Sequence, residues 1–279
     1  MRIAVTGAGL IEDVDKGKMI DLSELPRQVR TFLRVEELCL YAAHKAIKDA
    51  ELSIIKDPAS IGIVLGVDEG IDDCKAQFFC GLLTDGPEGA SPILFPFTSP
   101  NAITAQVSIA FGIQGENITI ANGSLSSGKA IAYAMDILRL GKVRAVITGG
   151  VTHNCAVVTV LEDLEAATKR GVRIYGEITG YGESHTGGHV LAITQAIEDA
   201  NLLKDDVDSL WINEDAGNIP GESWPIKRFD NNGAASSAMA VVTTLLTMNG
   251  KVKVVTVTGP HGGSSSLVIT TEKEGTCLS

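Results

Sequence analysis

The stretch NITIANGSLSSGKAIAYAMDILRLGKVRAVITGG, residues 117–150, contains the clearest structural pattern of the sequence. Its first part, residues 117–121, is rich in β-branched and apolar side chains and predicts a strand. After a turn of glycine and serine, residues 126–141 place apolar side chains at helical spacing, begin with serine and end at a glycine. Residues 143–150 predict a second strand. A strand, a turn, a helix and another strand form the repeating unit of an α/β protein with covered sheets.

The same alternation extends to both ends of the chain. Strands are predicted at 2–6, 61–66, 172–181, 208–213, 251–258 and 265–271, helices at 35–50, 100–112, 188–200 and 233–249, and a strand that passes into a helix at 157–170. Gly7 and Gly9 are expected to close the first strand. The pattern indicates a duplicated α/β unit, with halves at 1–171 and 172–279 packed as one body.

Composition and charge exclude several classes of function. The chain of 279 residues has 34 acidic and 23 basic side chains, a net charge of −11, which would repel nucleic acid. Its five cysteines are scattered without CxxC spacing, as expected of free thiols in a reducing compartment. There is no signal-peptide pattern and no apolar run long enough to cross a bilayer. We therefore expect a cytoplasmic protein without a membrane span.

Motifs for metals and cofactors are also missing from the sequence. No phosphate-binding loop or dinucleotide fingerprint is present, and no cofactor is expected. His185 and His189 are four residues apart and, with Glu183, could hold a metal if they shared a helix. Gly187 and Gly188 argue against a helix there, so no metal site is expected.

Several segments together resemble the β-ketoacyl synthase family. The matching stretches, in the family's order, are IAVTGAGL (3–10), the helical region at 26–52, SPILFPFTSPNAITAQVSIAFGIQGENITI (91–120), ANGSLSSGKAIAYAMDILRLGKVRAVITGGV (121–151) and VTVLEDLEAATKRGVRIYGEITGYG (158–182). The resemblance implies a thiolase-like fold with two βαβαβ halves in five α-β-α-β-α layers, usually in a dimer. It also implies condensation of an acyl group held on a cysteine with a malonyl unit on acyl carrier protein, aided by two histidines and a lysine.

The family's cysteine position is occupied by Ser124, at the start of the helix that follows residues 117–121. The positive end of a helix can lower the pKa of a thiol and produce a thiolate. A serine hydroxyl stays protonated at pH 7 and needs a neighbouring base to become a nucleophile. Ser124 therefore does not replace the cysteine in condensation. The alternative reading is a helix N-cap within residues 123–126.

The other catalytic positions are changed as well. Asp215 occupies the slot of the first histidine, and Asp230 falls near the slot of the second, where a helix-capping turn is the alternative. Lys227 matches the family's lysine. His261 stands about where the family has a phenylalanine, in a glycine-rich turn where a solvated histidine is the simpler reading. Carboxylates accept hydrogen bonds where imidazolium groups would donate them, and they would repel a malonyl carboxylate.

Two functions follow from this pattern. The first is a non-condensing partner or acyl-binding subunit of fatty-acid or polyketide-type metabolism. It would take acyl carrier protein or an acyl-CoA thioester and pair with itself or a full-length ketosynthase through the strand at 117–121. The alternative is an acyltransferase or thioester hydrolase using Ser124 and His261, with Asp215 or Asp230 orienting the ring. A synthase with an altered mechanism is a third possibility, which the three substitutions disfavour.

Overall fold

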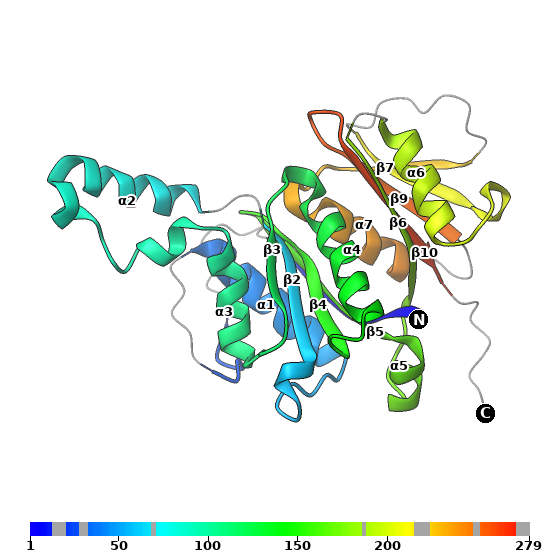
Figure 1. Cartoon of the computed structure of the whole chain (residues 1–279), viewed down its shortest axis with the longest axis horizontal. Helices are drawn as coiled ribbons and strands as arrows, with labels where there is room; N and C mark the ends of the chain where they lie inside the picture. The colour runs from blue at the N-terminus through cyan, green and yellow to red at the C-terminus, as the bar shows by residue number, and fades with distance from the viewer. Residues whose placement is uncertain are drawn as a thin grey trace.

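The computed structural model describes residues 1–12, 21–27, 33–67, 71–185, 188–214, 224–247 and 252–271. Ten strands form one hydrogen-bonded sheet in the order β3-β2-β4-β5-β1-β6-β10-β9-β7-β8 (Figure 1). The strands are β1 (Ile3–Glu12), β2 (Ile61–Val67), β3 (Asn117–Ile120), β4 (Ala145–Val151), β5 (Cys155–Asp163), β6 (Gly176–Ser184), β7 (Ser209–Asn213), β8 (Ile226–Phe229), β9 (Val252–Thr258) and β10 (Ser264–Thr270). The helices are α1 (Arg34–Asp49), α2 (Asp72–Asp85), α3 (Asn101–Phe111), α4 (Ser126–Arg139), α5 (Leu164–Arg170), α6 (Gly188–Asp199) and α7 (Ser236–Thr247). None of the helices in the described ranges combines the length and apolarity needed to cross a bilayer.

The two halves of the sheet have the same topology. From the outer edge inward, β3-β2-β4-β5-β1 corresponds to β8-β7-β9-β10-β6, with parallel pairs first and antiparallel pairs toward the centre. The halves meet where β1 and β6 pair over the short stretch Ile3–Val5. This arrangement confirms the predicted α/β fold with duplicated halves. The boundary between residues 171 and 172 stays a prediction.

Helices cover both faces of each half and build three separate cores. One core lies between α1, α3 and the first half of the sheet, and a second lies around α4 and α7, which pack between the halves. The third lies between α6 and the second half. The order α, β, α, β, α gives the five layers predicted for a thiolase-like fold (Figure 1).

Strand β1 runs farther than the sequence pattern predicts. Gly7 and Gly9 lie inside the strand and do not close it, which corrects the expected end at residue 6. A Cβ atom built on Gly7 would lie 2.3 Å from the Ala46 carbonyl oxygen, and one on Gly9 would lie 2.0 Å from the Ala42 carbonyl oxygen. Both glycines are therefore required by the close approach of α1 to the strand.

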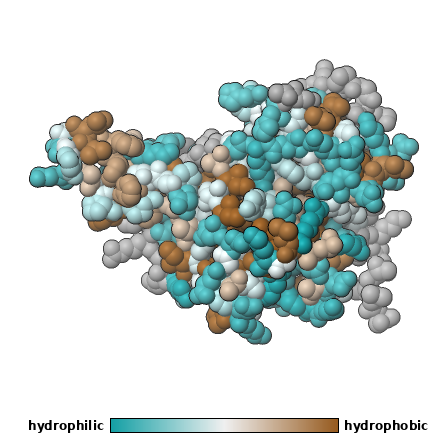
Figure 2. Space-filling model, viewed as in Figure 1, coloured by the Kyte–Doolittle hydropathy of each residue, from teal (hydrophilic) through white to brown (hydrophobic). Residues whose placement is uncertain are grey.

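Two elements escaped prediction. Helix α2 projects from the body, and of its residues only Cys74 is buried (Figure 1). Brown, apolar side chains gather on this projecting end in Figure 2, and Phe79 and Leu83 of α2 are exposed. Strand β8 has only four residues, three of them exposed, and it forms the edge of the sheet beyond β7. Neither element has buried apolar side chains at the regular spacing from which a helix or a strand is predicted.

Candidate functional site

The turn before α4 holds Ser124 in a 3₁₀ segment, Gly123–Leu125. Gly123 has a φ of +57°, a conformation that favours glycine, and it reverses the chain directly after β3. The Ser126 hydroxyl accepts a hydrogen bond from the Asn122 amide at 2.7 Å and donates one to the Gly123 carbonyl at 2.7 Å. Ser126 therefore fastens the turn, and the structure does not bear out the reading of Ser124 as a cap.

The Ser124 hydroxyl is buried, and the described residues leave it without a hydrogen-bond partner. The residue is 6% exposed, and its Oγ finds no hydrogen-bond partner among the described residues. A Cβ atom on Gly259 would lie 3.3 Å from this Oγ, so the turn after β9 reaches the serine without a side chain between them. A buried hydroxyl without a partner is costly, which marks this position as one where a ligand or water can bind.

The second half of the chain repeats this turn without the hydroxyl. Gly233–Ala235 form a 3₁₀ segment before α7, and Gly233 has a φ of +53°. Ser236 accepts from the Asn232 amide and donates to the Gly233 carbonyl, each at 2.8 Å. Ala234 is thus the counterpart of Ser124. The duplicated backbone places a polar group at this position in the first half only.

The other predicted residues lie outside this buried turn. Lys227 is exposed on β8, with its Nζ atom 5.1 Å from the ring centroid of Trp211. Asp230 lies in the turn that precedes α7, as expected of a turn before a helix. His261 is exposed at the tip of the β9–β10 turn. Among the described residues none of the three is hydrogen-bonded to Ser124, and Asp215 lies outside the described ranges. Their catalytic roles stay predictions.

Glu183 and His185, considered above only as metal ligands, belong to a polar cluster beside the β9–β10 turn that the sequence did not predict. Glu183 Oε1 is 2.6 Å from Lys129 Nζ and 2.9 Å from His185 Nε2, and the Tyr181 hydroxyl donates to Glu183 Oε2 at 2.8 Å. Burial and the adjacent Glu183 carboxylate raise the pKa of Tyr181 far above its usual range.

The missed cluster has a recognisable signal in the sequence. Residues 181, 183 and 185 alternate along β6 and its end, so their side chains share one face. A Cβ atom on Gly263 would lie 3.3 Å from Leu125 Cδ1 and 4.0 Å from His185 Nδ1. His185 therefore approaches the same glycine-rich turn that approaches Ser124. Across the described ranges, no three His, Cys, Asp or Glu side chains gather as metal ligands.

No thiol stands at the start of α4, and the cysteines are placed elsewhere. Cys39, Cys74, Cys80 and Cys155 form no disulfide among the described residues, and Cys277 lies outside those residues. Cys39 is fully buried, and desolvation together with the Glu36 carboxylate raises its pKa to about 12. Such a thiol stays protonated at pH 7 and is not a nucleophile.

Comparisons with known proteins show the family to which the sequence is similar. The family described as "Beta-ketoacyl synthase, N-terminal domain" matches residues 6–168. The 3-oxoacyl-[acyl-carrier-protein] synthase 2 of Staphylococcus aureus is 27% identical over 72% of this chain and 60% of its own length. The enzyme of the same name from Vibrio harveyi is 25% identical over 70% of this chain and 59% of its own length. The chain thus spans about 60% of the length of the curated relatives that it matches.

Solved structures show the same fold at low sequence identity. One match is a chain from the structure of a type II polyketide synthase acyl-carrier protein in complex with its ketosynthase bound to the hexaketide. The TM-score is 0.79 and the sequence identity is 15%, and the match covers 97% of this chain and 99% of the matched one. The ishigamide ketosynthase/chain length factor also matches with a TM-score of 0.79, at 18% identity and with the same coverage. Because the family model matches residues 6–168, more than half of the chain, and the fold is that of solved ketosynthases, this chain belongs to the β-ketoacyl synthase family.

Proposed function

We propose that this chain is a non-condensing, ketosynthase-like partner or acyl-binding subunit of fatty-acid or polyketide-type metabolism. The observation that carries the proposal is the buried Ser124 hydroxyl at the start of α4, where the resemblance to the family implies a cysteine. A hydroxyl in this position can donate a hydrogen bond to an acyl carbonyl. It cannot form the anion that a condensing thiolate provides at neutral pH.

The residue types at the family's two histidine positions support the absence of condensation. Loss of CO2 from a malonyl unit leaves negative charge on the thioester oxygen, which needs hydrogen-bond donors there. Asp215 occupies the sequence position of the first histidine, and Asp230 falls near that of the second. No ion pair joins Asp230 to a cation within the described ranges. A carboxylate there repels a malonyl carboxylate instead of binding it.

The partners that we propose are acyl carrier protein or an acyl-CoA thioester, and a second ketosynthase-fold subunit. The matching structures support this choice, because one is a complex of an acyl-carrier protein with its ketosynthase and another is a ketosynthase/chain length factor. We also propose a cytoplasmic location, supported by four cysteines that form no disulfide within the described ranges.

The outer edge of β3 is the surface proposed for subunit pairing. This strand pairs only with β2 among the described strands, in parallel, with Asn117 opposite Ile63. The Ile63 amide donates to the Glu116 carbonyl, so by alternation the backbone groups of residues 117 and 119 point away from β2. A partner strand would bond to these groups.

Changing Thr119 to proline is expected to weaken subunit pairing at least about tenfold, which corresponds to roughly 1.4 kcal/mol. The proline removes an outward amide and leaves the bonds to β2 in place. Thr119→Val is the matched control, since it removes the hydroxyl bond to Thr104 but keeps the amide. Sedimentation equilibrium measures both variants, alone and with a full-length ketosynthase. A wild-type chain that stays monomeric and binds no ketosynthase contradicts this part of the proposal.

An acyltransferase or thioester hydrolase is the second candidate, and the unpartnered Ser124 hydroxyl is the observation that favours it. In that reaction Ser124 Oγ attacks the thioester carbonyl and passes its proton to a histidine, and the carbon–sulfur bond breaks as the protonated thiol leaves. The sequence predicts His261 as the base. The Glu183–His185 pair approaches the same turn and gives a second histidine to compare.

Exposure of the wild-type chain to acyl-CoA is expected to leave its intact mass unchanged, because no described base is bonded to Ser124 Oγ. Mass spectrometry at short times detects any acyl-enzyme. An adduct that forms in the wild type and is lost in Ser124→Ala would establish the second candidate and contradict the first. His261→Gln and His185→Gln would then identify the base.

A further inference from the structure

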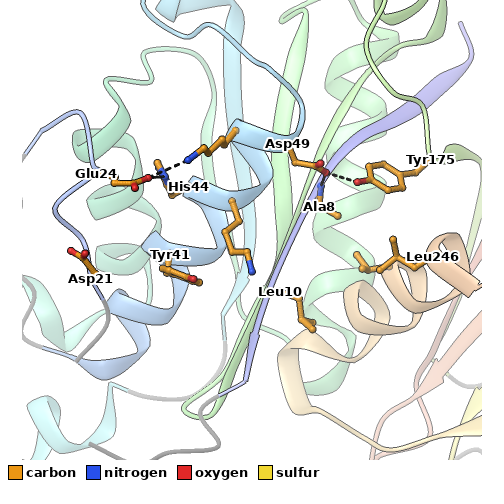
Figure 3. A pocket seen from close by; sticks show the side chains of 12 residues that line it. Ala8, Leu10, Asp21, Glu24, Tyr41, His44, Asp49, Tyr175 and Leu246 are labelled. Carbon is orange, nitrogen blue, oxygen red and sulfur yellow. Dashed lines mark hydrogen bonds and ion pairs between the residues drawn. The ribbon is translucent and has the colours of Figure 1, made fainter. Parts of the chain in front are cut away.

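A cavity of about 790 Å³ lies between α1, the distal part of β1 and α7, away from the Ser124 turn. None of its lining residues belongs to the turns at 122–128 or 259–263. Figure 3 shows Tyr41 of α1 on one side of this cavity and Leu10 of β1 and Leu246 of α7 on the other. The cavity is distinct from the proposed acyl site and has to be explained by its own chemistry.

An open strand edge forms one wall. Strand β1 pairs with β6 only at Ile3–Val5, and beyond that point β5 is its single neighbour among the described strands. The Ala8 amide points away from β5, because it donates to Asp49 Oδ2 at 2.9 Å. Alternation along an antiparallel strand then directs the amide and carbonyl of Leu10 to the same open side. No described residue bonds to that amide, so a donor faces the cavity.

At the Ala8 end of this open strand edge, the polar groups already have hydrogen-bond partners within the protein. Asp49 accepts a second hydrogen bond, from the Tyr175 hydroxyl at 2.8 Å. Burial and this carboxylate raise the pKa of Tyr175, so the phenol stays protonated and remains a donor at neutral pH. The groups available to a ligand therefore lie around Leu10 and not around Ala8.

Apolar side chains line the cavity beside the open edge. Leu10 is 37% exposed and Leu246 is 59% exposed, and both line the cavity together with the buried Val242. Large apolar side chains exposed within a concave surface are typical of ligand sites. Covering the two leucines with an aliphatic chain would remove this surface from water.

Among the described residues that line the cavity, one lysine has no carboxylate partner. Glu24 Oε2 is 3.2 Å from His44 Nε2 and 3.3 Å from Lys48 Nζ. Asp21 accepts from the Ser23 amide. Lys45 is exposed, with its ammonium 5.4 Å from the Tyr41 ring centroid, and no described carboxylate lies within ion-pair distance of it.

We propose that this cavity binds an amphipathic carboxylate, such as a fatty acid. The carboxylate head meets the Lys45 ammonium and the Leu10 amide, and the aliphatic tail lies along Leu10, Val242 and Leu246. The site needs no covalent step. It is independent of the function proposed for the Ser124 turn.

Isothermal titration with decanoate tests the site. Lys45→Glu is expected to weaken decanoate binding at least about tenfold, because it reverses the cation left available by the described lining, and Leu246→Asp is expected to weaken it by a similar factor. Lys56→Glu is the matched control, since Lys56 is an exposed lysine outside the cavity and the charge change is the same. The decanoate affinity of this variant is expected to stay within about twofold of wild type. Decanol, which lacks the charge, is expected to bind at least about tenfold more weakly than decanoate.

Each variant is first compared with the wild type by thermal unfolding. Because Lys45 and Leu246 are both exposed, their substitutions are expected to leave the unfolding temperature unchanged. The proposal is overturned if decanoate does not bind to the wild-type chain. It is also overturned if Lys45→Glu and Leu246→Asp bind decanoate as the wild type does, or if decanol binds as tightly as decanoate.

Discussion

Replacing Gly66 by alanine is expected to lower the free energy of unfolding by about 3 kcal/mol, the upper range for forcing extra volume into a packed interior. Gly66 lies in β2, where a Cβ atom would come within 2.5 Å of the Ser126 carbonyl carbon and the Ser127 nitrogen. These are backbone atoms at the start of α4, so no side chain can move aside. The strand or the helix would have to shift, and the Ser124 turn would shift with it.

Gly62→Ala is the control in the same strand. A Cβ atom on Gly62 would lie 3.4 Å from the Glu116 carbonyl oxygen, and its next contacts are flexible side chains, so the change is expected to cost less than about 1 kcal/mol. Urea unfolding measures both variants under one protocol. Equal midpoints for the two variants would show that β2 and α4 are not held at the separation described.

Changing Ser124 to cysteine is expected to create the most reactive thiol within the described part of the chain. The side chain stands at the start of α4, a helix of 14 residues, where the partial positive charge favours a thiolate. Burial acts in the opposite direction by raising the pKa of the thiol. We expect the helix dipole to lower the pKa of the thiol by more than burial raises it, because the residue lies within one turn of the helix N-terminus, where the dipole is strongest.

Cys39 provides the internal reference for the Ser124→Cys variant. Its pKa is raised to about 12 by burial, so it is expected to resist iodoacetamide at pH 7, while the thiol introduced by Ser124→Cys reacts at least about a hundredfold faster. Peptide mapping after timed alkylation distinguishes the two positions, and acyl-CoA is expected to leave an acyl group on the new thiol. A new thiol that is no more reactive than Cys39 would contradict the expectation that the start of α4 favours a thiolate at this position.

The sequence predicts the α/β alternation because most elements carry buried apolar side chains at a clear period. It predicts the thiolase-like fold because the order of the family's segments is kept across residues 1–182. It mistakes Gly7 and Gly9 for a turn, since local preference cannot reveal that α1 lies against β1. Helix α2 and strand β8 are missed because nearly all of their residues lack full burial.

The sequence predicts the position of the candidate site but not the roles of its residues. The position of the turn follows from its glycine and serines, but two serines two residues apart cannot be assigned their roles without the backbone. Hydrogen bonds show that Ser126 fastens the turn and leave Ser124 without a described partner. The Glu183–His185 pair was passed over because a four-residue spacing pointed to His189, whereas His185 follows the end of β6 and His189 lies in α6.

The most direct test of a pocket that positions acyl groups without condensing them is a chain-extension assay on the purified chain alone. Acyl and isotopically labelled malonyl thioesters of acyl carrier protein are supplied together, and products are analysed by mass spectrometry. We predict no product lengthened by two carbons, with the same result for the wild type and for Ser124→Ala. Malonyl-dependent lengthening by the wild-type chain, lost in Ser124→Ala, would contradict the account.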